Sequence, residues 1–226
     1  MSTPSRVEVA PERLAGWLGR FASAHGDVTW SVDRETSPSS WLAAAADGSW
    51  ARLSTWRDPE DVPDGPGGQG RQGEALGEWA APPALLVVLV RRGGYAVGVA
   101  SSAGELVAHK VGTRHVQSRT AAGGWSQQRF ARRRANQADA LVEAVVGHAS
   151  RVLGEGQAVL GAVGGLVLGG DRALSAEVLD AVASGPASRL HGIPRRELPD
   201  LPDPRRAVLD EAVRRGRAVR IAVSNA

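Results

Sequence analysis

Residues 85–100, LLVVLVRRGGYAVGVA, decide the fold of this chain. The first six are a continuous apolar run, which is typical of a strand buried on both faces. Gly93-Gly94 gives a two-residue hairpin signal, and Tyr95–Ala100 resumes as a second strand. Residues 101–104 predict another turn, and residues 105–116 a third strand. The stretch therefore predicts an antiparallel meander of three strands.

A long helix is expected after a loop over residues 117–126. Apolar residues recur at helical spacing from Phe130 to Leu153, and Gly154 stands where a C-terminal cap is expected. The remaining segments predict a strand, two helices and a last strand, at residues 158–168, 172–184, 204–216 and 218–223. This order of elements predicts a mixed α/β layer fold.

The N-terminal region differs in composition. Residues 12–24 predict a short helix, and residues 27–57 carry four tryptophans and predict two or three strands. These tryptophans suit a small core, or base stacking of the kind that single-strand binders use. Residues 58–83 are rich in Pro and Gly and predict a linker. We therefore expect an N-terminal Trp-rich α+β region (1–57), this linker (58–83) and a main domain (84–226).

The totals exclude several functional classes. The chain has 226 residues, a formal net charge of +3 and no cysteine, so disulfides, thiol catalysis and cysteine-ligated zinc are excluded. No apolar run approaches the ~20 residues that span a membrane, and no signal peptide is visible. We expect a soluble, cytoplasmic protein that binds neither membrane nor DNA. The five histidines have no metal-ligand spacing, so we expect no metal and no cofactor.

Positive charge is concentrated in one window. Residues 106–138 contain no acidic residue, and their excess exceeds that of the whole chain. Such a patch favours phosphate backbones, although a solvated basic helix face is the alternative interpretation. Arg129 and Arg133 share a helix face, where an external anion would offset their repulsion. The cationic residues of the window are Lys110, Arg114, Arg119, Arg129, Arg132, Arg133 and Arg134.

A glycine-rich segment lies inside this window, and it reads Gly123-Gly124-Trp125-Ser126-Gln127-Gln128. Two glycines allow the backbone to approach a ligand closely. Ser126 is a suitable N-cap for the following helix, whose N-terminus offers unpaired N–H groups. The segment therefore presents backbone donors and side-chain amides amid arginines.

Over roughly residues 84–223 the chain resembles the actinobacterial branch of the Vms-type (tRNA-hydrolase) release factors of ribosome quality control. These are distant relatives of the middle domain of eukaryotic and archaeal class I release factors. The specific part runs from Val111 to Gln137, where Gly124-Trp125-Ser126-Gln127 matches the family's Gly-x-x-Gln loop between a strand and a long helix.

The resemblance implies an RNase H-like α/β fold and hydrolysis of the ester that joins a nascent peptide to tRNA on stalled large ribosomal subunits. It implies Gln127 as the catalytic position, within a segment that also comprises Gly123, Gly124 and Ser126. The arginines at 114, 119, 129, 132, 133 and 134 would then contact tRNA or rRNA phosphates. The expected partners are the large subunit and peptidyl-tRNA.

Alternatives remain. Gly67-Gly68-Gln69 is a literal Gly-Gly-Gln, but it lies in the linker, downstream of acidic residues and without a long basic helix after it. A non-catalytic ribosome- or tRNA-binding factor would use the same arginines, and a free-standing peptidyl-tRNA hydrolase would act off the ribosome. A two-metal nuclease needs clustered carboxylates, which the basic window lacks. Gly169-Gly170-Asp171 predicts an ordinary turn and helix cap rather than an anion site.

Overall fold

The computed structural model describes residues 3–36, 39–59, 72–113, 126–184 and 187–226, and it describes the side chains of all of these except 72–75 and 126–138. The chain divides into two compact units. The first comprises Met1–Pro82 together with Arg217–Ala226, and the second comprises Pro83–Gly216. No described helix is long and apolar enough to cross a membrane.

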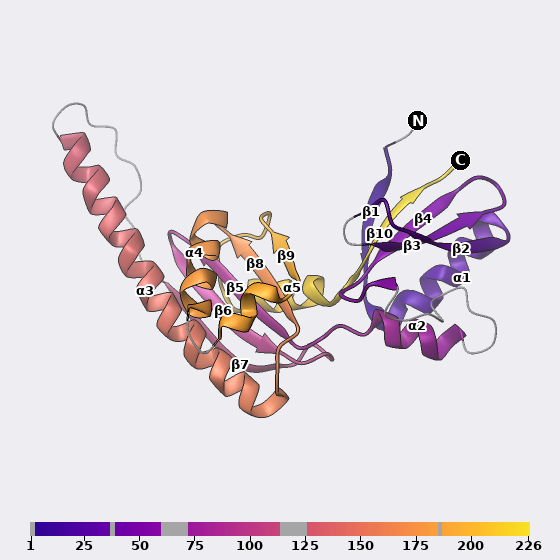
Figure 1. The fold of residues 1–226 in the computed structure, drawn as a ribbon. Coiled ribbons are helices and arrows are strands. Elements are labelled where there is room, and N and C mark those ends of the chain that lie inside the picture. Colours follow the sequence, from indigo (N-terminus) through magenta and orange to yellow (C-terminus); the bar gives the residue numbers. More distant parts are fainter. Residues whose placement is uncertain (1–2, 37–38, 60–71, 114–125, 185–186) are drawn as a thin grey trace. The chain divides into compact units, whose positions relative to one another are not determined.

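The first unit is an antiparallel five-stranded sheet with helices packed on one face (Figure 1). The strand order is β1-β10-β4-β3-β2. Its core combines Trp41 and Leu53 of the sheet with Leu14 and Phe21 of α1 and Trp79 of α2. The tryptophans at 41 and 79 are therefore core residues. The elements are β1 (Ser5–Val9), η1 (Pro11–Arg13), α1 (Leu14–His25), β2 (Val28–Asp33), β3 (Ser40–Ala45), β4 (Trp50–Ser54), α2 (Gln72–Ala80) and β10 (Val219–Ser224).

Two features of this unit differ from expectation. Residues 72–80, within the predicted linker, form α2, because Leu76, Trp79 and Ala80 supply an apolar face that the core buries. The last strand was expected in the main domain, but β10 pairs with β1 and β4, where Ile221 lies opposite Val7 and Leu53. The chain thus returns to the first unit after α5. Pairing partners so far apart in sequence leave no local signal.

The second unit contains the mixed sheet β7-β6-β5-β8-β9 (Figure 1). The β5–β6 and β6–β7 pairs are antiparallel, as the meander predicts, whereas β5–β8 and β8–β9 are parallel. The turn between β5 and β6 falls at Arg92-Gly93, because Arg91 pairs with Gly94. The elements are β5 (Leu85–Arg91), β6 (Gly94–Ala100), β7 (Leu106–Thr113), α3 (Ser126–Leu160), β8 (Gly165–Gly170), α4 (Arg172–Ala183), η3 (Ser188–Gly192), β9 (Arg195–Leu198) and α5 (Arg206–Arg217).

Helices cover both faces of this sheet. Side chains of β5, β6 and β8 form one core with α3 and α4, including Val88, Val97 and Leu168. On the opposite face α5 approaches closely: a methyl group at Gly216 would lie 2.7 Å from Val167 Cγ2, and one at Gly98 would lie 3.2 Å from Leu209 Cδ2. The result is a three-layer α/β/α arrangement, which explains why β5 and β6 are apolar on both faces.

The third helix, α3, is longer than expected. It has 35 residues and continues through Gly154 to Leu160, after which Gly161 adopts a φ of 76°. Gly154 has no cap role, and residues 158–160, predicted to begin a strand, still belong to the helix. The helix continues because Val152 and Leu153 are buried before Gly154, and Gly156 packs against Val99 just after it.

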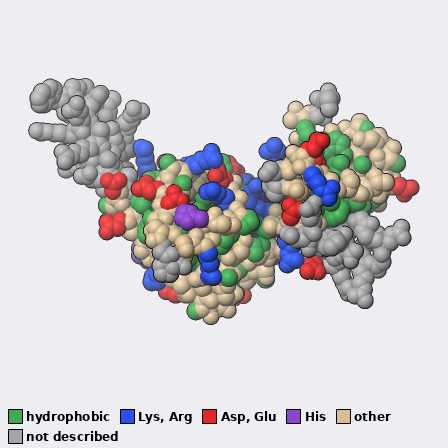
Figure 2. Space-filling view, in the orientation of Figure 1, with side chains coloured by type: hydrophobic (Ala, Val, Ile, Leu, Met, Phe, Trp, Pro, Cys, Tyr) green, Lys and Arg blue, Asp and Glu red, His purple; other side chains and the backbone are tan. Residues whose placement is uncertain are grey.

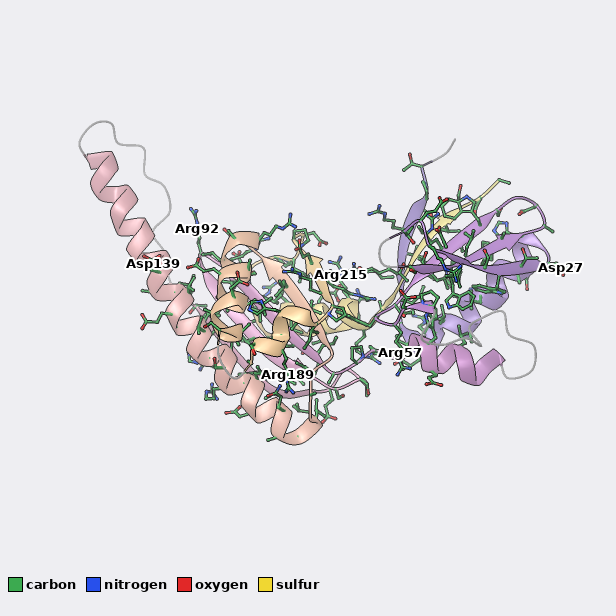
Figure 3. The ribbon with its side chains drawn as sticks, in the orientation of Figure 1. Asp27, Arg57, Arg92, Asp139, Arg189 and Arg215 are labelled. Carbon is green, nitrogen blue, oxygen red and sulfur yellow. The ribbon has the colours of Figure 1, made fainter. Side chains whose placement is uncertain are left out.

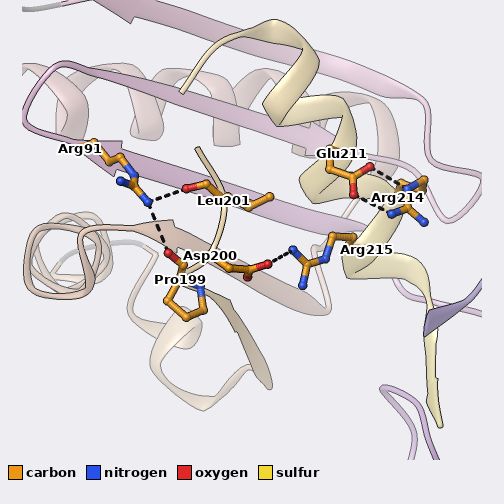
Figure 4. A network of polar contacts seen from close by, with 7 residues as sticks. All are labelled: Arg91, Pro199, Asp200, Leu201, Glu211, Arg214 and Arg215. Carbon is orange, nitrogen blue, oxygen red and sulfur yellow. Dashed lines mark hydrogen bonds and ion pairs between the residues drawn. The ribbon is translucent and has the colours of Figure 1, made fainter. Parts of the chain in front are cut away.

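Polar contacts of Arg91, Asp200 and Arg215 hold the segment between β9 and α5 (Figure 4). Nη2 of Arg91 donates to the Leu201 carbonyl at 2.6 Å, and Arg215 pairs with Asp200 at 2.7 Å. The Arg215 hydrogen bond lowers the pKa of Asp200, and burial opposes this only partly. Strand β9 was not predicted, since Leu198 is the only apolar residue in Arg195–Leu198.

Replacement of Trp79 tests whether α2 belongs to the first core. Trp79→Ala removes a fully buried side chain, so it should lower the free energy of unfolding of the first unit by about 3–5 kcal/mol. Urea unfolding followed by circular dichroism measures this. The matched control is Gly77→Ala on the same helix, where a methyl group meets nothing within 4 Å. Equal stability of the two variants would contradict the packing of α2.

Replacement of Ile221 tests the placement of β10. Ile221 is 2% exposed in the first core, so Ile221→Ala should cost about 2–5 kcal/mol there. Hydrogen exchange followed by mass spectrometry should show faster exchange in β3 and β4, with β5 and β8 protected as before. Loss of protection confined to β5 and β8 would show that the last strand stabilises the second unit instead.

Candidate functional site

The Gly-x-x-Gln segment ends in the first turn of α3. The helix begins at Ser126, so Gln127 is its second residue and Ser126 is the first helical residue rather than the cap before it. Such a position lies among the N–H groups that have no partner inside a helix. Gly123, Gly124, Arg114 and Arg119 lie outside the described residues. For Gln127, and for the arginines at 129, 132, 133 and 134, the structure describes the helical backbone but not the side chains.

The N-terminal part of α3 extends past the end of the sheet (Figure 1). The first residue of α3 whose side chain is described as buried in the core is Leu141. Gln127 precedes Leu141 by fourteen positions, and a rise of 1.5 Å per residue therefore places Gln127 about 21 Å further along the helix. The fold therefore places the backbone of Gln127 near the end of a helical arm that extends past the sheet (Figure 1).

Charge divides between the two units. The first carries nine arginines against twelve acidic residues, whereas the second carries eighteen Lys and Arg against twelve acidic residues. On α3 itself the acidic residues begin only at Asp139, after the four arginines. Blue basic side chains are interspersed with red acidic ones on the visible face of the second unit (Figure 2). The start of α3, by contrast, carries four arginines and no acidic residue, so positive charge is concentrated there.

The carboxyl edge of the second sheet carries further charged residues. Strands β5, β8 and β9 run parallel and end there, and Thr113, the last residue of β7, lies opposite Gly94 at the same edge. Figure 3 shows Arg92 pointing outward from the β5–β6 turn. This edge and the arm therefore belong to the same end of the unit.

Two hollows at this edge have mixed charge. One of about 310 Å³ includes Arg172, Arg195 and Glu197 in its lining, and Arg172 Nε pairs with Glu197 at 3.1 Å. The other, of about 340 Å³, includes Arg92 and Asp203. Acidic groups accompany the arginines in both hollows and would repel a phosphate. The segment around Gln127, which has no acidic residue, is better suited to a phosphate group.

The turn Gly169-Gly170-Asp171 acts as the predicted cap. Gly170 has a φ of 88°, and the Asp171 carboxylate accepts hydrogen bonds from the amides of Ala173 and Leu174 at 3.1 and 3.2 Å. These contacts occupy the first turn of α4. Within the described ranges there is no group of three or more His, Asp or Glu that could hold a metal ion. This part of the chain offers no carboxylate cluster for two-metal nuclease chemistry.

Sequence reasoning missed the residues that hold α3 on the sheet. Tyr95 of β6 stacks on His148 of α3, with ring centroids 5.3 Å apart and an interplanar angle of 16°. Burial lowers the pKa of His148, and the nearby positive charges of Lys110 and Arg151 lower it further. The sequence shows His148 within the apolar stripe of a helix, but it does not show that Tyr95 contacts it. The literal Gly67-Gly68-Gln69 lies outside the described residues.

Comparison with solved structures and curated proteins adds little. A crystal structure of Pelota from Archaeoglobus fulgidus is similar, with 14% sequence identity over 94% of this chain and a TM-score of 0.33. The chain spans 65% of the length of that Pelota chain. A TM-score this low establishes no shared fold. Among curated proteins none matches the chain significantly.

Comparison with protein families gives a clear result. The model of the Actinobacteria/chloroflexi VLRF1 release factor family (acVLRF1) matches residues 83–222. The match covers more than half of the chain and includes the whole second unit, from the β5–β6 hairpin through α3 to α5. It confirms the release-factor resemblance that the Gly-x-x-Gln segment indicated. The chain therefore belongs to the Actinobacteria/chloroflexi VLRF1 release factor family.

Proposed function

We propose that this protein hydrolyses the ester bond between a nascent peptide and tRNA on stalled large ribosomal subunits, with Gln127 at the reacting centre. Membership of a release factor family makes a role in translation at the ribosome the starting point. One observation carries the finer proposal: Gln127 lies in the first turn of a 35-residue helix whose N-terminal part extends past its sheet.

The length of the arm suits a buried substrate. An α-helix satisfies its backbone hydrogen bonds internally, so it can project without a supporting sheet. An arm about 21 Å long can enter a space that the three-layer body cannot. A peptidyl-tRNA ester inside a ribosomal cavity presents this requirement, because the body must stay outside while one side chain reaches the bond.

The chemistry needs placement more than a strong base. A water oxygen attacks the ester carbonyl carbon, the bond to the ribose oxygen breaks, and that oxygen leaves as a hydroxyl after taking a proton. A side-chain amide or backbone N–H at Gln127 would orient the water and stabilise the oxyanion. A single oxyanion donor contributes about 2.7–4 kcal/mol, and positioning contributes several more. Gly123 and Gly124 would let the backbone approach the ester, and Ser126 would begin the helix there.

The basic segment would hold RNA around the arm. Arg129, Arg132, Arg133 and Arg134 follow Gln127 directly in α3, and no acidic residue intervenes before Asp139. Their mutual repulsion costs free energy that RNA phosphates would relieve. Arg114 and Arg119 would add contacts from the segment before the helix. The partners in this proposal are the large subunit and peptidyl-tRNA.

The proposal extends to the fold. We assign the second unit to the RNase H-like class, and its topology supports the assignment. Numbered within the unit, the strands have the order 3-2-1-4-5, with the second strand antiparallel to the first and the last two parallel to it. At the carboxyl edge, where such folds place ligands, this chain carries Arg91 as the last residue of β5 and Arg92 directly after it. Hydrolysis would therefore occur on the arm instead of at this edge.

Replacement of Gln127 tests the catalytic role. Gln127→Ala should reduce peptide release from stalled large-subunit complexes at least 100-fold, because a donor to the transition state is lost. Binding to the complexes should persist. The matched control is Gln69→Ala in the Gly67-Gly68-Gln69 stretch, which should release peptide normally. Full release by Gln127→Ala would reject Gln127 as the catalytic residue, and loss only in Gln69→Ala would move that role to Gln69. A wild-type protein that binds the complexes but releases no peptide would be a non-catalytic binding factor.

Replacement of the four arginines tests the RNA contact. The quadruple change of Arg129, Arg132, Arg133 and Arg134 to Ala should weaken ribosome binding and lower its log–log salt slope by about 3. Sedimentation across a salt series measures both. The control is Arg13→Ala with Arg20→Ala, two exposed arginines of the acidic unit. An unchanged slope in the quadruple variant would exclude a phosphate role.

A further inference from the structure

Gly156 of α3 lets the helix approach the sheet closely at one point. A methyl group at Gly156 would lie 2.5 Å from both Cβ and Cγ1 of Val99 on β6. Carbon atoms in contact prefer about 3.5–4.0 Å, so only glycine allows the helix backbone to rest directly on Val99. Both residues are buried. The helix backbone and the Val99 side chain are therefore in direct contact at this point, with no side chain of α3 between them.

Two aromatic rings separate α3 from the sheet at a second point. Tyr95 of β6 lies directly opposite Gly112 of β7, and a methyl group at Gly112 would lie 2.4 Å from Tyr95 Cζ. The ring of Tyr95 therefore covers Gly112. On its other side the imidazole of His148 stacks nearly parallel to it at 5.3 Å. The order from strand to helix is Gly112, the Tyr95 ring, then the His148 ring.

These two contacts lie on one line along β6. Tyr95 and Val99 are four residues apart, about 13 Å in a strand, and His148 and Gly156 are eight residues apart, about 12 Å in a helix. The helix therefore follows β6, resting on it at Gly156 and standing off by two rings at His148. The helix axis is therefore closer to the sheet at Gly156 than at His148. The distance between helix and sheet increases toward the N-terminus of α3.

We infer that the Gly112–Tyr95–His148 stack and the Val99–Gly156 contact set the tilt of α3 and thereby aim Gln127. Gln127 precedes His148 by 21 residues, about 32 Å along the helix, whereas the contacts are about 12 Å apart. A change in height at either contact is therefore multiplied about threefold at the tip. The residues of both contacts are positioning residues for the proposed reaction, on which this role rests; the tilt itself does not depend on that reaction.

Opposite substitutions should move the tip in opposite directions. In Gly156→Ala the contact with Val99 must open by about 1 Å, which lifts the rear of the helix and lowers the tip toward the sheet by about 3 Å. In Gly112→Ala the added methyl pushes the ring stack outward and raises the tip by about 3–4 Å. His148→Ala removes one ring without creating a clash, so it should lower the tip. It also provides a test if a glycine variant fails to fold.

Distances between spin labels measure the tilt directly. Because the chain has no cysteine, Ala131→Cys on α3 and Ala207→Cys on α5, on the opposite face of the sheet, define one label pair. The mean distance should shorten in Gly156→Ala and His148→Ala and lengthen in Gly112→Ala. The matched control is Gly154→Ala on the same helix, where a methyl group meets nothing within 4 Å, and it should leave the distance unchanged.

Peptide release at saturating protein provides the functional readout. Gly156→Ala and Gly112→Ala should slow release by about 100-fold, the effect of a misplacement of 1 Å or more, with the half-saturating concentration unchanged. Distances that stay within about 1 Å of the control, or that shift in one direction for both glycine variants, would overturn the inference. Shifted distances with normal release in every variant, Gln127→Ala included, would leave the tilt mechanism standing and refute the proposed catalytic role of Gln127.

Discussion

The packing of α3 against one face of the second sheet determines where every part of the proposed site lies. Leu141, Val145 and Val152 bury their side chains in the core that the sheet shares with α4. Burial of such side chains contributes about 1.5–3 kcal/mol each, which fixes the inner part of the helix firmly. The outer part then inherits its direction from the buried part, because a continuous α-helix transmits orientation through its own hydrogen bonds.

The inner and outer parts of α3 differ in composition. Its inner part carries an apolar stripe and the acidic residues Asp139, Glu143 and Glu155, whereas its first thirteen residues carry four arginines and no acid. The inner part is suited to a folded core, and the outer part to a polyanion. The second unit as a whole is basic and the first is acidic, so the second unit is better suited to a polyanion. The basic segment, the extension past the sheet and Gln127 thus all belong to α3.

Local patterns predicted most of the second unit, and long-range pairing accounts for what they missed. The apolar runs of β5 and β6 and the stripe of α3 are local signals, as is Asp171 at the start of α4. The placement of β10 beside β1, and the short strand β9, depend on partners distant in sequence. The Gln127 segment could be located from its neighbours, but the Tyr95–His148 stack could not, since it joins residues 53 positions apart.

Photocrosslinking from position 128 tests the central claim that the tip of α3 reaches the peptidyl-tRNA ester. A photoreactive amino acid in place of Gln128, next to Gln127, should crosslink to the 3′ end of tRNA in stalled large-subunit complexes. The same group in place of Val159, 66% exposed near the other end of α3, should not. Crosslinks to the tRNA 3′ end from position 159, with none from position 128, would contradict the claim.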